Sequence, residues 1–82
     1  MESIEILINT ASKIKNFINI ITKFEGDFDL ASGRYVVDAK SIMGVFSMDF
    51  SRPLKLNMYC EDNIKEEVKQ SLAEFICSRT NS

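Results

Sequence analysis

Three of the four predicted strands alternate apolar and polar residues, which is the pattern of a strand with one buried face. In the first stretch, the isoleucines at positions 4, 6 and 8 alternate with Ser3, Glu5 and Leu7. The third stretch is rich in β-branched and aromatic residues, and Ser32 and Gly33 before it are typical of a hairpin turn. The predicted strands cover residues 2–8, 27–32, 34–38 and 54–60.

Apolar residues recur every three or four positions in two longer stretches, as on the buried face of an amphipathic helix. The first helix is predicted over residues 11–23, with Gly26 soon after its end. The last helix is predicted to start at Asp62 as its cap, with Lys69 and Arg79 late in it, where the helix dipole favours basic residues; residues 80–82 are expected to fray. The predicted buried positions are Ile14, Phe17, Ile18 and Ile21 in the first helix and Ile64, Val68, Leu72, Phe75 and Ile76 in the last.

Within residues 39–48, between two predicted strands, a further short helix is predicted from about Ser41 to Met48. Ser41 suits the N-cap, because its hydroxyl can accept a hydrogen bond from a free backbone N–H of the first turn. Gly44 weakens the helix, and Pro53 prevents its continuation. So short a helix cannot bury all of its large apolar residues, so we expect two of them in the core and the rest in an exposed docking surface. These residues are Ile42, Met43, Phe46 and Met48.

The predicted element order is β-α-β-β-α-β-α. One-sided strands and helices with one apolar stripe each imply an α+β fold, in which a four-stranded antiparallel sheet is covered on one face by three helices. The 82 residues suffice for one core, so we expect a single domain over residues 1–82.

Composition excludes several functions. The net charge of −2 argues against nucleic-acid binding, and no apolar run is long enough to cross a bilayer. We therefore expect a cytoplasmic protein that binds neither nucleic acid nor membrane. The chain has no histidine, which removes the commonest general base and most zinc sites. Cys60 and Cys77 are expected to be reduced, partly buried thiols, and no cofactor or metal site is predicted.

Several polar residues have a plain structural interpretation beside a chemical one. Thr10 and Ser12 are interpreted as helix caps rather than nucleophiles, because no activating base accompanies them. Asp27, Asp29 and Asp38 flank the predicted hairpin and are interpreted as a solvated polar surface rather than a cation site. For Ser41, position and residue type alone favour a cap role.

Two segments resemble the HPr family, the small phosphocarriers of the bacterial sugar phosphotransferase system. Residues 39–45, with Ser47 beyond them, are similar to the regulatory-serine segment of HPr proteins, and residues 23–30 are similar to their helix-to-strand junction. The resemblance covers nearly the whole chain and implies the family's open-faced β-sandwich.

The resemblance also implies where the family's two phosphorylation sites fall. Carrier members hold phosphate on the histidine of a His-Ala-Arg-Pro segment, and counting back from Leu30 places that segment on Thr10, Ala11, Ser12 and Lys13. Phosphate relay is therefore not expected, because a threonine ester is no substitute for phosphohistidine. This arrangement is Crh-like, since that paralogue also lacks the histidine and retains the serine.

The family's second phosphorylation site, the regulatory serine, corresponds to Ser41 in this resemblance. The resemblance implies phosphorylation of Ser41 by HPr kinase and binding of the phosphoserine form to a carbon-catabolite transcriptional regulator, with phosphotransferase components as further partners. The predicted partner-binding residues are Lys40, Ile42, Met43 and Phe46.

Three functions compete. The first is a non-enzymatic regulatory module switched at Ser41. The second is an interaction domain that docks partners through Ile42 and Phe46 without regard to phosphate. The third is an enzyme or carrier using Thr10, Ser12 or Cys60, and it is disfavoured because the sequence shows no activating base.

Overall fold

The computed structural model describes residues 2–77, in which four strands form one antiparallel sheet. The strands are β1 (Glu2–Ile6), β2 (Asp27–Ser32), β3 (Tyr35–Asp38) and β4 (Leu54–Tyr59). Their order across the sheet is β1-β4-β2-β3, so β1 and β3 are its edges. The register follows the alternation of the sequence: Leu30 lies opposite Leu56 on β4 and Val37 on β3, and all three side chains turn to the same face.

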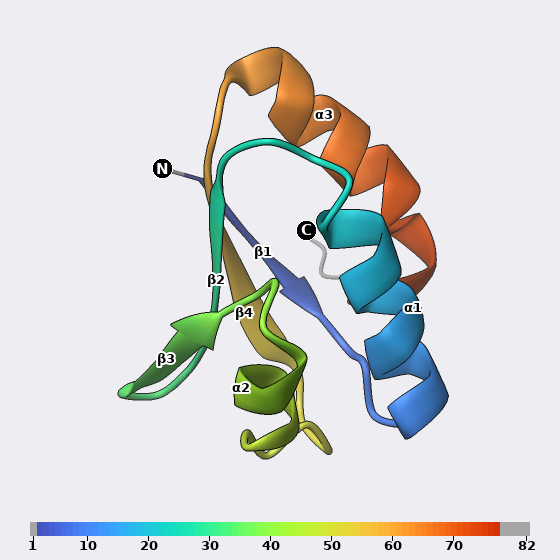
Figure 1. Ribbon diagram of the computed structural model, residues 1–82, viewed down its shortest axis with the longest axis vertical. Coiled ribbons are helices and arrows are strands. Elements are labelled where there is room, and N and C mark those ends of the chain that lie inside the picture. Colours follow the sequence, from blue (N-terminus) through green and yellow to red (C-terminus); the bar gives the residue numbers. More distant parts are fainter. Residues whose placement is uncertain (1, 78–82) are drawn as a thin grey trace.

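Three helices cover that face. They are α1 (Ala11–Ile21), α2 (Ile42–Phe46) and α3 (Asp62–Ser71), and a 3₁₀ turn, η1 (Ala73–Phe75), continues α3. Figure 1 shows α1 and α3 on one side of the sheet and no helix on the other, while α2 lies at the end near the start of α1. The predicted α+β fold and element order are confirmed.

The core lies between the sheet and the helices. Its members are apolar side chains from every strand except the edge strand β3, together with the inner faces of the helices, and no polar side chain is buried among residues 2–77. The central members with no exposed surface include Ile14, Phe17, Leu30, Leu56 and Leu72.

Several predicted boundaries were wrong by one to a few residues. β1 ends at Ile6 rather than at residue 8, because Leu7 already donates its backbone N–H to the Phe75 carbonyl at 2.8 Å. Buried Ile8 lies in the connection to α1. α1 ends at Ile21 and β4 at Tyr59, each before its predicted end. Of the predicted helix stripes, Ile18, Ile64 and Ile76 are only partly buried.

The start of α3 also differs from its prediction. The N-cap is Glu61, whose side chain makes no capping hydrogen bond, and Asp62 is the first helical residue. Asp62 lies in the first turn, where its negative charge suits the helix dipole, and it also pairs with Lys65 at 3.4 Å. Arg79 and the tail 80–82 lie outside the described residues.

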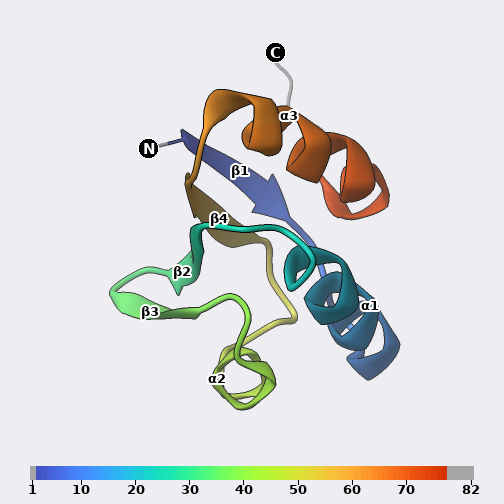
Figure 2. The ribbon, with the colours of Figure 1, turned by 45° about the horizontal axis from the view of Figure 1, so that its top comes forward.

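The two edge strands of the sheet differ in whether another segment of the chain lies along them. The chain after η1 returns along β1, where Cys77 donates its N–H to the Glu5 carbonyl at 2.9 Å and Ile76 bridges Ile6. β3 has no such neighbour among residues 2–77, and both views show its outer edge open (Figure 2).

Candidate functional site

Ser41 caps α2 as the sequence predicts. Its Oγ accepts a hydrogen bond from the Gly44 N–H at 3.2 Å, and its carbonyl accepts from the Val45 N–H at 3.0 Å. Its own N–H donates to the Asp38 carbonyl at 3.0 Å. The residue is exposed, so a well-fixed backbone presents its hydroxyl at the surface.

α2 buries a different residue from those expected. Its five residues pack against α1 and β3, and Gly44 faces β3 so closely that a Cβ there would lie 3.2 Å from the Val37 Cβ. This orientation turns Val45 into the core with no exposed surface, and of the four large residues considered only Met48 is also buried. The prediction that two of the four are core was wrong.

The remaining three form an exposed apolar surface, which we call the α2 patch and define as Ile42, Met43 and Phe46. Met43 is 80% exposed, Ile42 39% and Phe46 37%. The Phe46 ring rests edge-on against Phe50, with 5.9 Å between the ring centroids, which limits its freedom. The predicted exposure of apolar residues beside Ser41 is confirmed.

Lys40 fixes the segment that precedes Ser41. Its ammonium donates to the carbonyls of Phe24 at 2.7 Å and Gly26 at 3.2 Å, and lies 5.3 Å from the centroid of the Phe28 ring. Its backbone N–H donates to the Asp38 carboxylate at 2.9 Å. This anchoring cannot be predicted from residue spacing, because the contacts join residues far apart in the chain. The partner-binding role of Lys40 stays a prediction.

The far end of α2 is tied to the sheet. Ser47 Oγ donates to the Gly44 carbonyl at 2.6 Å and lies 2.7 Å from the Tyr35 hydroxyl. Since Ser47 has only one hydroxyl proton, the Tyr35 hydroxyl donates to Ser47 Oγ. Residue spacing carries no signal for this link, because Tyr35 and Ser47 are twelve positions apart in the chain.

The start of α1 has the same capping geometry as α2. Thr10 Oγ1 accepts from the Lys13 N–H at 3.1 Å, and the Lys13 ammonium donates to Asn9 Oδ1 at 3.2 Å. Thr10, Ala11 and Ser12 are exposed. The cap prediction is confirmed for Thr10 and wrong for Ser12, which is the second residue of the helix. α2 lies near the start of α1 (Figure 1).

Cys60 offers little nucleophilic chemistry. Its thiol is free and partly buried, and burial raises its pKa, so less of the reactive thiolate is present at neutral pH. Gly26 packs against it so closely that a Cβ at Gly26 would lie 2.7 Å from the Cys60 Cβ. Cys77 is also partly buried.

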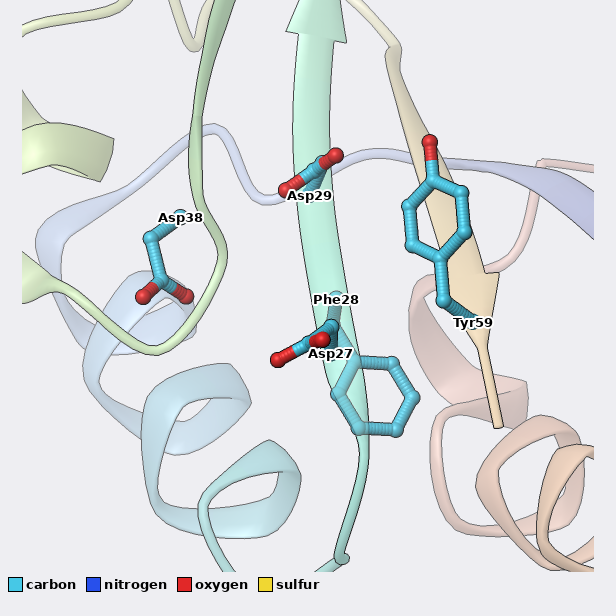
Figure 3. A pocket seen from close by; sticks show the side chains of 5 residues that line it. All are labelled: Asp27, Phe28, Asp29, Asp38 and Tyr59. Carbon is cyan, nitrogen blue, oxygen red and sulfur yellow. The ribbon is translucent and has the colours of Figure 1, made fainter. Parts of the chain in front are cut away.

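The three aspartates of the hairpin lie on the open face of the sheet. With Phe28 and Tyr59 they line a shallow hollow, in which Asp29 lies across from Asp38 (Figure 3). No group of three or more potential ligands within residues 2–77 is placed to hold a metal ion. Asp27 and Asp38 are exposed, as the polar-surface interpretation expects.

A family model described as "PTS HPr component phosphorylation site" matches residues 7–78, which include Thr10, Ser41 and every helix and strand except β1. The chain belongs to the HPr family. This member has no histidine, and the assignment of Thr10 to the position of the carrier histidine stays a prediction.

Solved HPr structures share the fold of this HPr-family chain. A protein named HPr-C-His from Thermoanaerobacter tengcongensis is 27% identical with a TM-score of 0.74, and the match covers 90% of this chain and 89% of that one. HPr from Bacillus anthracis is 19% identical with a TM-score of 0.71, covering 90% and 93%. The histidine-containing phosphocarrier of a Mycoplasma is 18% identical with a TM-score of 0.68, covering 89% and 91%.

A search of curated proteins gave no match. Among residues 2–77, no helix has the length and apolar character that a membrane span requires.

Proposed function

We propose that this HPr-family chain is a cytoplasmic regulatory module that HPr kinase phosphorylates on Ser41, and that it does not relay phosphate through position 10. In this proposal it is a Crh-like, non-enzymatic member of the family. Its phosphoserine form binds a carbon-catabolite transcriptional regulator.

The chemistry at Thr10 supports the loss of relay. Phosphate relay needs a side chain whose bond to phosphorus is labile. The nitrogen–phosphorus bond of a phosphorylated imidazole is labile, whereas the oxygen–phosphorus bond of an alcohol ester is not. The Thr10 hydroxyl accepts the Lys13 N–H, and the exposed neighbours Ala11 and Ser12 supply no base to activate it. A threonine at this position can cap the helix but cannot carry phosphate in a form that is readily transferred.

The observation that carries the proposal is the exposed Ser41 hydroxyl next to the α2 patch. A kinase needs a side-chain oxygen that it can reach, and the hydrogen bonds of Ser41 to Asp38 and Val45 use only backbone atoms. Among residues 2–77, the Oγ itself is engaged only by the Gly44 N–H at 3.2 Å. A phosphate at the cap retains an oxygen that can accept this N–H, and the first turn of α2 holds no acidic residue to repel it.

Phosphorylation would change how the α2 patch is recognised. It adds a charge of about −2 directly before Ile42 at neutral pH, so an apolar docking surface becomes one bordered by an anion. A partner with basic residues around an apolar groove would prefer the phosphorylated form, and a partner with acidic residues there would avoid it.

Intact-mass spectrometry after incubation with a bacterial HPr kinase and ATP tests the proposal. We expect the wild-type chain to gain one phosphoryl group, S41A to gain none, and S12A to behave as wild type because Ser12 is an exposed residue of α1 and is not part of the segment around Ser41. An authentic HPr phosphorylated in the same tube shows that the kinase is active. No gain on the wild-type chain under these conditions contradicts the proposal.

The exposure of Met43 at 80% favours one alternative, a docking module indifferent to phosphate. A side chain so exposed contributes little to folding and is suited to contact with a partner. Calorimetric titration of the transcriptional regulator with phosphorylated and unphosphorylated protein separates the two functions. Equal affinity of both forms, lost in F46D, favours the alternative.

A further inference from the structure

The outer edge of β3 is an unpaired strand edge with apolar side chains. Val36 is 53% exposed and Tyr35 50%, and β3 is the last strand in the sheet order. The opposite edge strand, β1, is paired at its C-terminal end, where Ile76 bridges Ile6 and Cys77 donates its N–H to the Glu5 carbonyl. Exposed edges with apolar residues are templates for pairing with another chain.

The hydrogen-bonding groups at this edge can be assigned from the ladder. Ala39 donates its N–H to the Phe28 carbonyl at 2.8 Å, so Ala39 turns its backbone groups toward β2. Backbone groups alternate between the two sides of an antiparallel strand, so those of Tyr35 and Val37 also turn toward β2. The N–H and carbonyl of Val36 therefore point outward, away from the sheet.

The charges around the edge are unbalanced within one chain. Asp29 and Asp38 lie directly across from each other, and like charges in this arrangement are destabilising. Neither carboxylate, nor the exposed Arg34 of the adjacent turn, forms an ion pair within residues 2–77. A cation beside Asp38 would relieve this repulsion.

A second copy of the chain supplies what this edge lacks. We propose that the protein forms a two-fold symmetric dimer in which the β3 strands of two copies pair antiparallel, with Val36 opposite Val36. In this register the outward N–H and carbonyl of each Val36 bond to their counterparts. Tyr35 lies across from Val37, and Arg34 lies across from Asp38.

The register is constrained by the faces of the sheet. In a two-fold symmetric antiparallel pair, the numbers of any two opposed residues add up to the same value. When this value is even, two opposed side chains come from the same face of their sheets. Centring on Val36 meets that condition and uses the backbone groups that point outward. It also brings Arg34 of each copy to the acidic side of the other, next to the hollow between Asp29 and Asp38.

The paired segment is short, so the dimer is weak. Four strand residues with one flanking arginine bury less than the roughly 1,200 Å² typical of stable complexes, so the dimer dissociates on dilution. This inference does not depend on phosphorylation of Ser41.

Sedimentation velocity over a wide concentration range tests the dimer. We expect a reversible monomer–dimer equilibrium in wild type that V36K abolishes, because two lysines would face each other across the symmetry axis. R34E is expected to weaken dimerisation about tenfold, since two attractive contacts become repulsive. N19K is the charge-matched control: Asn19 is exposed on α1, which takes no part in the pairing of the β3 strands, so this variant keeps the wild-type equilibrium.

Disulfide trapping tests the register. In a C60S/C77S background, V36C is expected to form a covalent dimer with diamide, since opposed residues of a hydrogen-bonded pair have Cα atoms about 5.5 Å apart, within disulfide range. Y35C in the same background is expected to stay monomeric, because position 35 faces position 37 of the second copy. Equal trapping of both variants contradicts this register.

A wild-type protein that stays monomeric at the highest concentration overturns the proposal. A dimer that persists in V36K but is dissociated by F46D also overturns it, because self-association would then use the α2 patch. The thermal unfolding of each variant, measured in parallel, separates loss of pairing from loss of folding.

Discussion

The starts of α1 and α2 are built alike and differ in what surrounds them. In both, a hydroxyl side chain accepts the backbone N–H three residues on, at 3.1 Å for Thr10 and 3.2 Å for Ser41. After Thr10 the exposed side chains are small, Ala11 and Ser12, whereas after Ser41 they are large and apolar, Ile42 and Met43. One capping geometry is therefore compatible with very different surfaces, and the surroundings distinguish a structural cap from a candidate regulatory site.

The two helices also differ in how they are held. α1 has eleven residues and buries Ile14, Phe17 and Ile21, so its own apolar face fixes it to the sheet. α2 has five residues and buries only Val45, so hydrogen bonds around it supply much of its positioning. Lys40 anchors its start, and the Ser47–Tyr35 contact anchors its end. The helix that offers the docking surface is thus the one with the smaller share of the core.

The largest expected effect contrasts two phenylalanines. F17A should lower the free energy of unfolding by about 3–5 kcal/mol, because it removes a fully buried ring and leaves a cavity. F46A should cost less than about 1.5 kcal/mol, since this ring is 37% exposed and its main contact is the edge of Phe50. Urea denaturation followed by circular dichroism measures both; comparable losses would show that α2 is bound to the core as firmly as α1.

A smaller effect is expected from the contrast between Lys40, which precedes α2, and Lys13, which lies in the first turn of α1. K40M should lower the free energy of unfolding by about 1.5–3 kcal/mol, because the carbonyls of Phe24 and Gly26 lose a charged donor. K13M should change it by less than about 0.5 kcal/mol, because the contact of Lys13 with Asn9 is exposed. Nuclear magnetic resonance spectra of K40M should also show shifted amides at Ser41 and Gly44. Unchanged shifts there would contradict the anchoring role of Lys40.

The smallest effect concerns the caps themselves. T10A and S41A should each lower the free energy of unfolding by about 1 kcal/mol, because each leaves one helical N–H without its acceptor. S41D, which retains a capping oxygen, should recover most of the loss and serves as the control. Denaturation midpoints compare the three variants; a loss several times larger in S41A than in T10A would break the structural equivalence of the two caps.

The sequence predicts the architecture because the long elements carry full periods of their pattern. β2, β4 and α1 each show several repeats of alternation or helical spacing, and their elements, order and faces are confirmed. The caps at Thr10 and Ser41 are also predictable, since a hydroxyl residue directly before a helix has few other roles.

Non-local contacts explain what the sequence does not predict. Five residues of α2 span little more than one turn, so no periodicity distinguishes Val45 from Ile42 as the inward residue. That choice depends on the close approach of Gly44 to Val37 on β3. The anchoring of Lys40 on the α1–β2 connection and the contact of Tyr35 with Ser47 likewise join segments that only the fold brings together.

The contrast between the two caps is tested most directly by offering the protein both phosphate donors of its family and counting phosphoryl groups. One reaction contains HPr kinase with ATP, and the other contains the general phosphotransferase enzyme with phosphoenolpyruvate; authentic HPr serves as the control in each. We predict one phosphoryl group from the kinase, present in T10A and absent in S41A, and none from phosphoenolpyruvate. A phosphoryl group gained from phosphoenolpyruvate, or one gained from the kinase by S41A, would contradict the account.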